Sequence, residues 1–391
     1  MRLQCNYQQK AIFLDRDGVL NQEVGHICHV DDFHLMDNVS QAIKCINQSD
    51  YLAIVITNQS AVARGLCTID DIEHIHKKME MLLGDNGAHI DAIYYCPHHP
   101  EKGMPGENPL YTINCDCRKP KIGMITHAAK DFNIDLKHSY FIGDTTRDIL
   151  CGKNAHLYTI GVYTGHGCKD GDVKPDWMFE DLYEAVSFII HDPLKPHIQN
   201  IMQKIKVSPI RPFVILIGGN TRSGKSTLAH YLALELRDRG ENVVEIALDN
   251  WLLPKEKRIK YDTVYERFQL EKIEKDCAHL FASQEIALPS YNCVHRITST
   301  EEIIYSLHNK SVVIVEGVVA LSSQTLRRFS ALSIYCDIEE QAMKNRIFSF
   351  YTWKGLSESE INNLYKKRKK DEYDIIRKEK CYADMIIENT L

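Results

Sequence analysis

Residues 11–19 read AIFLDRDGV, an apolar run of strand length followed at once by two acidic side chains and a glycine. The run Ala11–Leu14 predicts a short buried strand, and the carboxylates of Asp15 and Asp17 come directly after it. In open sheets of parallel strands, ligands bind beyond the carboxyl ends of the strands. The stretch therefore predicts an α/β fold with a pair of carboxylates at its binding edge.

Apolar runs of similar length alternate with helical patterns along the whole chain. Helical periodicity extends, for example, over Ile69–Leu83 and Gly123–Phe132, and helices are expected after Gly224 and in the charged C-terminal region. The remaining strand candidates are Leu52–Thr57, Ala92–Tyr95, Tyr140–Ile142, Tyr158–Gly161, Phe213–Ile217, Asn242–Ala247, Val312–Val315 and Ser333–Cys336. This alternation indicates two mostly parallel sheets, each flanked by helices.

Length and proline placement divide the chain into two domains. The 391 residues exceed an ordinary single domain, and two domains of about half that length fit the usual range. Prolines gather over about Asp192–Arg211, where the sequence reads HDPLKPH and SPIRP between periodic segments. We predict a domain over 1–192, a linker over 193–210 and a second domain over 211–391.

Composition restricts the class of protein and its compartment. The net charge of -6 and the pI near 6.3 do not favour nucleic acid as a partner, since its binders usually carry a basic face. The longest apolar stretches, around Phe213–Ile217 and Ser311–Leu321, are too short to span a bilayer. The odd count of thirteen cysteines and the polar opening MRLQCNYQQK, which is not a secretory signal, favour reduced thiols and a cytoplasmic location.

The acidic pair of the first half suits phosphoryl chemistry. Asp15 can attack phosphorus and form an acyl phosphate, while Asp17 can protonate the leaving oxygen and then activate water. Attack on a phosphate dianion also needs Mg²⁺ and a cationic side chain to neutralise charge. An Asp-x-Asp pair alone is also common in turns and helix caps, so further motifs have to support this interpretation.

Three such motifs follow in order. Thr57-Asn58-Gln59-Ser60 offers hydroxyl and amide donors to a phosphate after the second strand candidate. Arg118-Lys119-Pro120 supplies a cation, and Gly143-Asp144-Thr145-Thr146-Arg147-Asp148 supplies carboxylates after another strand. This order resembles the haloacid dehalogenase superfamily.

The resemblance implies a role for each motif. It implies Asp15 as nucleophile and Asp17 as general acid and base, with Thr57 and Lys119 holding the transferring phosphoryl group. It further implies that Asp15, the Asp17 carbonyl and Asp144 bind Mg²⁺. Asp148 is expected to hold these groups in position without itself binding Mg²⁺ or the substrate.

Two cysteine-containing pairs predict a metal-bound loop. Cys96-Pro97-His98 and Cys115-Asp116-Cys117 enclose a segment with glycine and proline, and three thiolates with one imidazole suit a structural Zn²⁺. His99 adjoins His98, so spacing alone leaves the imidazole ligand open. Surface cysteines in a reduced protein are the alternative. A bound zinc ion would also position Lys119, because Arg118 and Lys119 directly follow Cys117.

Four sequence segments restrict the resemblance to particular families within this superfamily, namely DRDGVLN, TNQSAVARG, YYCPHHP and CDCRKP. Over about residues 10–190 they are similar to D-glycero-D-manno-heptose-1,7-bisphosphate 7-phosphatases and nearly as close to histidinol-phosphate phosphatases. The segment Ser60–Gly65 favours the heptose branch, although Ala61 stands where that family often has glycine. The resemblance implies His98 as the zinc ligand and a phosphorylated sugar as substrate. Asn58, Gln59, Ser60, Arg64 and Arg118 are then expected to bind it, with Arg118 at a distal phosphate or sugar hydroxyl.

The second half contains a complete phosphate-binding loop after the apolar run FVILIG. The loop reads Gly219-Asn220-Thr221-Arg222-Ser223-Gly224-Lys225-Ser226-Thr227 and matches the Walker A pattern. Its backbone N–H groups are expected to wrap the phosphates of ATP at a helix N-terminus. Lys225 would reach the β- and γ-oxygens, and Ser226 would bind Mg²⁺.

Acidic residues after two further strands indicate transfer to an acceptor. Asp249 follows VVEIAL and could accept a hydroxyl proton, whereas Glu316 ends VVIVEG and could hold Mg²⁺ through water. Together with the loop, the texts LDNWLLP, PSYNCVHR and VVIVEGVVAL resemble the uridine kinase and phosphoribulokinase group. That resemblance implies Asp249 as catalytic base. LDNWLLP departs from the nucleoside kinases, which leaves the acceptor open.

The same resemblance implies further binding residues in this half. It suggests a substrate pocket near Tyr291, His295 and Arg296, and a lid cation at Arg346, for which a plain helix arginine is an equal alternative. The basic run Lys366–Lys370 is most simply a solvated helix face, with attraction of phosphate or polynucleotide as the alternative.

The sequence thus predicts a bifunctional enzyme that requires Mg²⁺, Zn²⁺ and ATP. One domain would dephosphorylate a sugar (bis)phosphate, and the other would phosphorylate a sugar or nucleoside. Three alternatives stay open: a polynucleotide 3′-phosphatase and 5′-kinase, a histidinol-phosphate phosphatase with a fused kinase, and a scaffold with one inactive half. The zinc loop and the acidic net charge count against the first, and the oligomeric state is left open.

Overall fold

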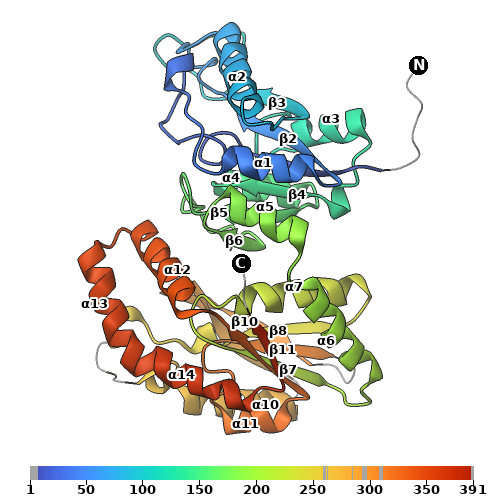
Figure 1. Cartoon of the computed structure of the whole chain (residues 1–391), viewed down its shortest axis with the longest axis vertical. Coiled ribbons are helices and arrows are strands. Elements are labelled where there is room, and N and C mark those ends of the chain that lie inside the picture. The colour runs from blue at the N-terminus through green and yellow to red at the C-terminus, as the bar shows by residue number, and fades with distance from the viewer. Residues whose placement is uncertain are drawn as a thin grey trace. The chain divides into compact units, whose positions relative to one another are not determined.

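The computed structural model describes residues 8–258, 261, 263–283, 285–292, 297–307 and 311–388. The chain divides into two compact units, and the boundary in the sequence lies between Asp192 and Pro193. Figure 1 shows each unit as a sheet with helices packed on it. Within the described ranges, no helix combines the length and apolar character needed to cross a membrane.

The first unit is built on a six-stranded parallel sheet with the order β3-β2-β1-β4-β5-β6. Its strands are β1 (Lys10–Leu14), β2 (Tyr51–Asn58), β3 (Ala92–Cys96), β4 (Tyr140–Gly143), β5 (Tyr158–Val162) and β6 (Trp177–Phe179). The first five are the predicted strands. The sixth, WMF, is too short for its pattern to be read from the sequence. Because β2 and β4 pair with the two sides of β1, the segments that follow these strands converge at one edge.

Helices cover this sheet. The helices of the unit are α1 (Val39–Asn47), α2 (Ile69–Gly84), α3 (Gly123–Phe132), α4 (Thr146–Asn154) and α5 (Leu182–His191). Ala11 and Phe13 of β1 pack in one apolar cluster with Ile125 of α3 and Cys151 of α4. Helices α1 and α5 lie against each other (Figure 1). The buried core thereby holds β1 and the site at its end in a fixed frame.

The second unit contains a five-stranded parallel sheet with the order β13-β12-β7-β11-β8 and a separate antiparallel hairpin, β9–β10. The strands are β7 (Phe213–Gly218), β8 (Val243–Ala247), β9 (Glu285–Asn292), β10 (Ile297–Ser306), β11 (Val312–Glu316), β12 (Leu332–Asp337) and β13 (Met385–Glu388). The four predicted strands are all in the sheet. The hairpin was not predicted, because β9 overlaps the segment PSYNCVHR that was interpreted as part of a substrate pocket. Strand β13 was not predicted, because the C-terminal region was expected to be helical.

Both faces of this sheet are apolar. Its helices are α6 (Lys195–Val207), α7 (Lys225–Asp238), α8 (Lys255–Arg258), α9 (Val264–Arg267), α10 (Leu270–Ser283), α11 (Gln324–Phe329), α12 (Glu340–Trp353), α13 (Glu358–Arg368) and α14 (Asp374–Lys378). Phe213 and Ile215 of β7 face a cluster with α6 and α7, whereas Val214 and Leu216 face a cluster with α10 and α11. Helices α12 and α13 pack around a small core of their own.

The predicted linker over 193–210 is wrong for most of its length, because these residues form α6. Pro196 lies in the first turn of this helix, where proline is tolerated. Ile198, Ile201 and Ile205 recur at helical spacing and are buried in the core of the second unit. The prolines were interpreted as loop signals, and they outweighed this apolar periodicity.

Replacing Ile201 by alanine tests whether α6 belongs to the core of the second unit. Ile201→Ala should lower the free energy of unfolding of that unit by about 2–5 kcal/mol, because it leaves a cavity beside β7. Chemical denaturation measures this, with Gln203→Ala on the exposed side of α6 as the matched control. Equal stability of the two variants would contradict the packing of α6.

Candidate active sites

The first site lies where β1, β2 and β4 end. Asp15 follows β1, Thr57 is near the end of β2, and Asp144 follows β4. The Nζ atom of Lys119, in the loop before α3, lies 2.8 Å from Oδ1 of Asp15 and 2.6 Å from Oδ1 of Asp148. Nucleophile, cation and acidic groups expected from four separate motifs are thus in one place.

The loop that carries Lys119 is attached to the end of β2 by a side chain. The Nδ2 group of Asn58 donates to the Lys119 carbonyl at 3.2 Å, and Oδ1 of Asn58 accepts from the Lys119 N–H at 3.0 Å. Asn58 was assigned to substrate phosphate, but its amide is used for this reciprocal pair. It therefore holds the lysine in position.

Three carboxylates crowd together at this edge. Oxygen atoms of Asp15, Asp144 and Asp148 lie within 4.8 Å of one another. Burial, with the neighbouring negative charges, raises the pKa of Asp15 to about 7 and that of Asp144 to about 8. Burial also acts on Asp148, but the charge of Lys119 and hydrogen bonds from Lys119 and Thr145 leave its pKa lowered.

The crowded carboxylates fit a divalent cation. The Oδ1 atom of Asp144 is buried and accepts no hydrogen bond from the described residues. Gly18 has a φ of +78°, and a Cβ there would lie 2.3 Å from Oδ2 of Asp144, so only glycine leaves room beside this carboxylate. Asp15 and Asp144 could hold Mg²⁺, which prefers oxygen ligands. Asp148 is tied to Lys119 and Thr145 and can orient the lysine.

Asp17 is enclosed by donors. The guanidinium group of Arg16 contacts both of its oxygens, and side-chain amides of Asn21 and Gln59 donate at 3.0 and 2.8 Å. Burial alone would raise the pKa of Asp17, but the positive charge of Arg16 and these hydrogen bonds lower it. Gln59 was assigned to substrate phosphate. Its Nε2 group instead donates to Asp17 and to Oγ1 of Thr57.

Two arginines lie close to histidines of the neighbouring loops. Nη2 of Arg64 is 3.3 Å from Nε2 of His99, and Nη1 of Arg118 donates to the His98 carbonyl at 3.1 Å. Burial and the charges of Arg64 and Arg118 lower the pKa of His26, so His26 is close to both arginines. Sequence reasoning missed His26, because no motif distinguishes it from the neighbouring histidines of the same loop.

A second group of possible ligands adjoins Asp144. Atoms of Glu23, Asp144 and His166 also lie within 4.8 Å of one another, and the His166 N–H donates to Oδ2 of Asp144 at 2.8 Å. Glu23 and His166 were not singled out from the sequence. They come from two loops far apart in the chain, so no local spacing could have indicated their meeting.

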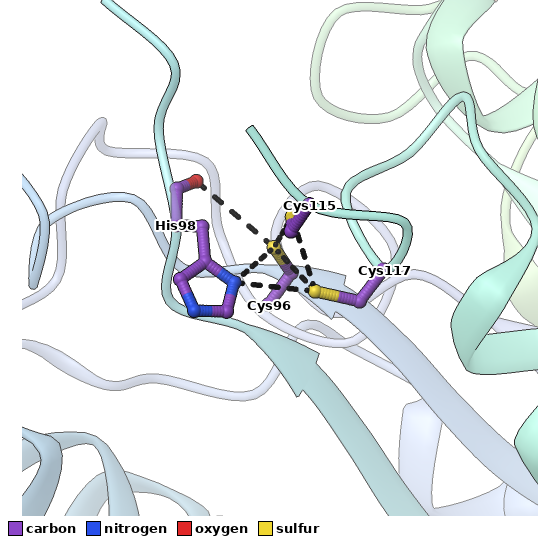
Figure 2. A group of neighbouring side chains, drawn as sticks. All are labelled: Cys96, His98, Cys115 and Cys117. Carbon is purple, nitrogen blue, oxygen red and sulfur yellow. Dashed lines mark hydrogen bonds between the residues drawn. The ribbon is translucent and has the colours of Figure 1, made fainter. Parts of the chain in front are cut away.

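Four ligand atoms converge at the two ends of the cysteine loop (Figure 2). The sulfur of Cys117 lies 3.2 Å from those of Cys96 and Cys115 and 3.3 Å from Nδ1 of His98. These separations far exceed a disulfide bond of about 2.05 Å. They are slightly shorter than the edge of roughly 3.7 Å expected for a tetrahedron of sulfurs around Zn²⁺. His99 points elsewhere, with its Nε2 atom near Arg64.

The second site lies where β7 ends. Gly224 has a φ of +88° and precedes α7, so the phosphate loop runs directly into a helix N-terminus. A Cβ on Gly219 would lie 2.3 Å from the Cys336 carbonyl oxygen, which requires glycine there. Lys225 is buried and donates to the Asn220 carbonyl at 2.7 Å. Burial lowers the pKa of Lys225.

Two acidic groups face this lysine. Ser226 donates to Oε2 of Glu316 at 3.1 Å, which places the two expected Mg²⁺ ligands side by side. Burial and the charge of Asp249 raise the pKa of Glu316 to about 7. Burial also raises the pKa of Asp249, against the opposing charges of Lys225 and Arg258. The site therefore combines a phosphate loop, a cation site and a carboxylate that is able to accept a proton.

The expected lid cation reaches the phosphate loop. Arg346 of α12 donates to the Arg222 carbonyl at 3.2 Å, and the Arg222 guanidinium lies 3.4 Å from the centre of the Phe350 ring. His295 and Arg296 lie outside the described residues, and only the backbone of Tyr291, in β9, is described. The predicted acceptor pocket at these three positions therefore stays a prediction.

A buried ionic group near Asp249 was missed. Arg267 pairs with Asp371 at 2.9 Å and with Glu372 at 3.1 Å, and all three are nearly buried. Lys366, Lys367 and Lys370 of the preceding basic run are exposed. The charge of Glu372 acts on both Asp249 and Lys225. The acidic residues that follow the basic run thus approach the site, although the whole stretch looks solvated in the sequence.

Family models match both units. One described as HAD-hydrolase-like matches residues 116–185, and one described as the phosphoribulokinase/uridine kinase family matches residues 214–390. Over 184 residues the chain is 40% identical to a D-glycero-beta-D-manno-heptose-1,7-bisphosphate 7-phosphatase of Haemophilus ducreyi, which covers 46% of this chain and 98% of that protein.

Solved structures resemble each unit. A D,D-heptose 1,7-bisphosphate phosphatase from B. bronchiseptica, complexed with magnesium and phosphate, is 32% identical; the match covers 47% of this chain and 99% of that one, with a TM-score of 0.42. A possible uridine kinase from Bacillus stearothermophilus is 20% identical, with coverages of 51% and 98% and a TM-score of 0.35.

The crowded carboxylates predict a pH-dependent stabilisation by Mg²⁺. The raised pKa values of Asp15 and Asp144 mean that the metal-free protein loses stability as pH rises from about 4 to about 8, because ionisation is easier in the unfolded chain. A cation that binds the ionised pair removes this penalty. Calorimetry should therefore show a larger rise in melting temperature on adding MgCl₂ at pH 8 than at pH 5.

Two variants identify the carboxylate responsible. Asp144→Asn should raise the melting temperature of the metal-free protein at pH 8 and abolish most of the response to Mg²⁺. The control Asp85→Asn alters an exposed carboxylate at the end of α2 and should behave as wild type. A response to Mg²⁺ that is equal at both pH values would contradict the assignment.

Proposed function

The chain belongs in its first half to the HAD-like hydrolases related to heptose-bisphosphate phosphatases and in its second half to the phosphoribulokinase/uridine kinase family, and we propose that it dephosphorylates a sugar bisphosphate and phosphorylates a small hydroxyl compound with ATP. The observation that carries the phosphatase assignment is the position of Lys119. Its ammonium group contacts the nucleophile Asp15 inside a buried site. The kinase assignment depends on the buried Lys225 facing Asp249 and Glu316.

The phosphatase reaction proceeds in two steps. A carboxylate oxygen of Asp15 attacks phosphorus, the bond to the sugar oxygen breaks, and Asp17 gives that oxygen a proton. Asp17 then takes a proton from water, whose oxygen attacks phosphorus, so that phosphate leaves and Asp15 is restored. Lys119 and the Thr57 hydroxyl bind the phosphoryl oxygens. Asp15 and Asp144 would hold Mg²⁺, which would supply charge neutralisation.

We propose D-glycero-D-manno-heptose 1,7-bisphosphate, or a closely similar sugar bisphosphate, as the substrate. Relatives with that name match this chain over 184 and 183 residues, which is about the length of the first unit. Arg64 and Arg118 provide positive charge and donors beyond the reaction centre, as a second phosphate group requires, and His26, whose pKa is lowered, adds a neutral imidazole beside them. Histidinol phosphate, which has a single phosphate, would leave these cations without a charged partner.

We propose Zn²⁺ for the cysteine cluster. Three sulfurs and one imidazole nitrogen form a closed donor set, which suits a structural rather than a catalytic zinc ion. The ion would join the two ends of the loop and fix Arg118 and Lys119, which follow Cys117 directly. Both activities are proposed to operate in the cytoplasm, where reducing conditions preserve such thiolates and ATP is abundant.

In the kinase half, Lys225 and the loop amides would bind the phosphates of ATP. Asp249 takes the proton from the acceptor hydroxyl, the oxygen attacks the γ-phosphorus, and the bond to ADP breaks. Arg346 is positioned to cover the phosphates, because it already contacts the loop at Arg222. Mg²⁺ near Ser226 and Glu316 would supply charge neutralisation. A sugar or nucleoside is the proposed acceptor class.

The two activities should be separable by single substitutions. Asp15→Asn removes the nucleophile and should lower phosphate release from heptose 1,7-bisphosphate by more than about 10³-fold, while acceptor-dependent ADP formation stays unchanged. Lys225→Met should have the opposite effect. Phosphate release is measured over a panel of sugar bisphosphates, histidinol phosphate and a 3′-phosphorylated oligonucleotide, and ADP formation over a panel of sugars and nucleosides.

The panel also decides between the alternatives. Preference for histidinol phosphate would refute the sugar bisphosphate assignment. Turnover of the oligonucleotide that falls steeply with salt would support an end-repair enzyme instead. Equal loss of both activities in Asp15→Asn would contradict two independent sites.

Metal analysis tests the zinc proposal. The purified chain should contain about one Zn²⁺, since the donor set has four ligands. Cys115→Ser should lose the ion, and phosphate release should fall with it because Lys119 is no longer fixed. Cys45→Ser, which alters a cysteine outside the cluster, serves as the matched control. Stoichiometric zinc in Cys115→Ser would refute the ligand set.

A further inference from the structure

Both oxygens of Asp17 are held from one side by a network of three side chains. Nε and Nη2 of Arg16 donate to Oδ1 at 3.1 and 2.9 Å, and Nη2 also reaches Oδ2 at 3.0 Å. Asn21 donates to Oδ1 at 3.0 Å, and Gln59 donates to Oδ2 at 2.8 Å. Five donor contacts on one carboxylate leave little freedom for its rotation.

The side chain of Arg16 is itself held by burial and by further contacts. Its side chain is fully buried, and its Nη2 group also donates to Oε1 of Gln59 at 3.0 Å. Its Nη1 atom lies 3.4 Å from Nε2 of His76, a buried residue of α2 whose ring packs edge-to-face on Tyr95. The Arg16 carbonyl accepts from the Leu20 N–H at 2.8 Å. A buried guanidinium is costly unless it is paired, and here Nε and Nη2 are directed at Asp17 and at Gln59, which itself donates to Asp17.

We propose that Arg16 is a positioning residue that fixes the carboxylate of Asp17 where the leaving oxygen of the substrate must receive its proton. The inference rests on the proposed phosphatase reaction. The guanidinium is planar and forms a rigid fork, so it determines the orientation of a carboxylate as well as its charge. The Nε2 group of Gln59 donates both to Asp17 and to Oγ1 of Thr57, so Gln59 keeps the proposed acid and the phosphate-binding hydroxyl at a constant separation.

This role has a consequence that depends on the leaving group. In the first step the bond from phosphorus to Asp15 forms, the bond to the ester oxygen breaks, and Asp17, once protonated, gives its proton to that oxygen. The donors that lower the pKa of Asp17 stabilise the carboxylate that remains after this transfer. A basic leaving oxygen needs this proton, whereas the weakly basic p-nitrophenolate leaves without it. A loss of positioning should therefore slow phenyl phosphate much more than p-nitrophenyl phosphate. A defect in folding or in phosphate binding slows both equally.

The experiment compares kcat/KM for these two esters, with Mg²⁺, in the full chain. In Arg16→Met the value for phenyl phosphate should fall by about 10²-fold and that for p-nitrophenyl phosphate by less than about tenfold. Asp17→Asn should show the same asymmetry, and Arg16→Lys, which keeps the charge but lacks the fork, should lie between wild type and Arg16→Met. Lys77→Met removes an exposed charge from α2 and is the matched control, expected to match wild type.

Equal losses on the two esters, or no loss on either, would overturn the inference. If Arg16→Met fails to fold, as judged by its melting temperature and zinc content, Asn21→Ala provides the same comparison with Arg16 in place. Unchanged selectivity in that variant would also overturn it. Failure of the wild-type chain to release phosphate from either ester would refute the proposed phosphatase itself, and this inference with it.

Discussion

A buried ammonium group among carboxylates is the interaction on which the first unit depends. Lys119 contacts both Asp15 and Asp148, and without it three crowded acids would lie at one sheet edge with no internal counter-charge. Because an unpaired buried charge is costly, the surrounding structure has to keep the lysine in place. Asn58 holds its backbone from β2, and Cys117, the last residue of the cysteine cluster, lies two positions before it. The cluster can therefore affect catalysis although it lies outside the reaction centre.

The second unit solves the same physical problem in another way. Lys225 is buried next to the acids Glu316 and Asp249, but its position comes from the turn that begins α7 and not from a clamped loop. Local sequence determines such a turn, and for this reason the phosphate loop could be identified completely from nine consecutive residues. Lys119 could be identified only by the order of distant motifs. Each site lies at the carboxyl edge of its own parallel sheet, where the ends of neighbouring strands bring side chains together.

The sheets and the residue types of the sites could be predicted, whereas the partner of each side chain could not. Asp15, Thr57 and Asp144 follow adjacent strands, so topology alone brings them together. Asn58 and Gln59 have the same amide chemistry whether they bind a phosphate or a neighbouring side chain, and only packing decides between these roles. The pairing of Arg267 with Glu372 joins residues 105 positions apart, inside a stretch whose composition looks solvated. Helix α6 was missed because prolines concealed a clear apolar periodicity.

Two opposing chemistries in one chain place a constraint on what the two sites can bind. If both acted on the same hydroxyl position, the only net result would be the consumption of ATP, so different positions or different molecules are required. Arg64 and Arg118 bring positive charge close to His26 in the first unit, which agrees with the proposed substrate that keeps an anionic group after its reaction. Near Asp249 the kinase has a second buried carboxylate, Glu372, already paired with Arg267. The charges around Asp249 are mixed, because those of Lys225, Arg258 and Arg222 oppose that of Glu372, so charge alone does not select the acceptor. The separation of the two reactions therefore has to come from the shape and the hydrogen-bonding groups of each site, which determine the position or the molecule that it binds.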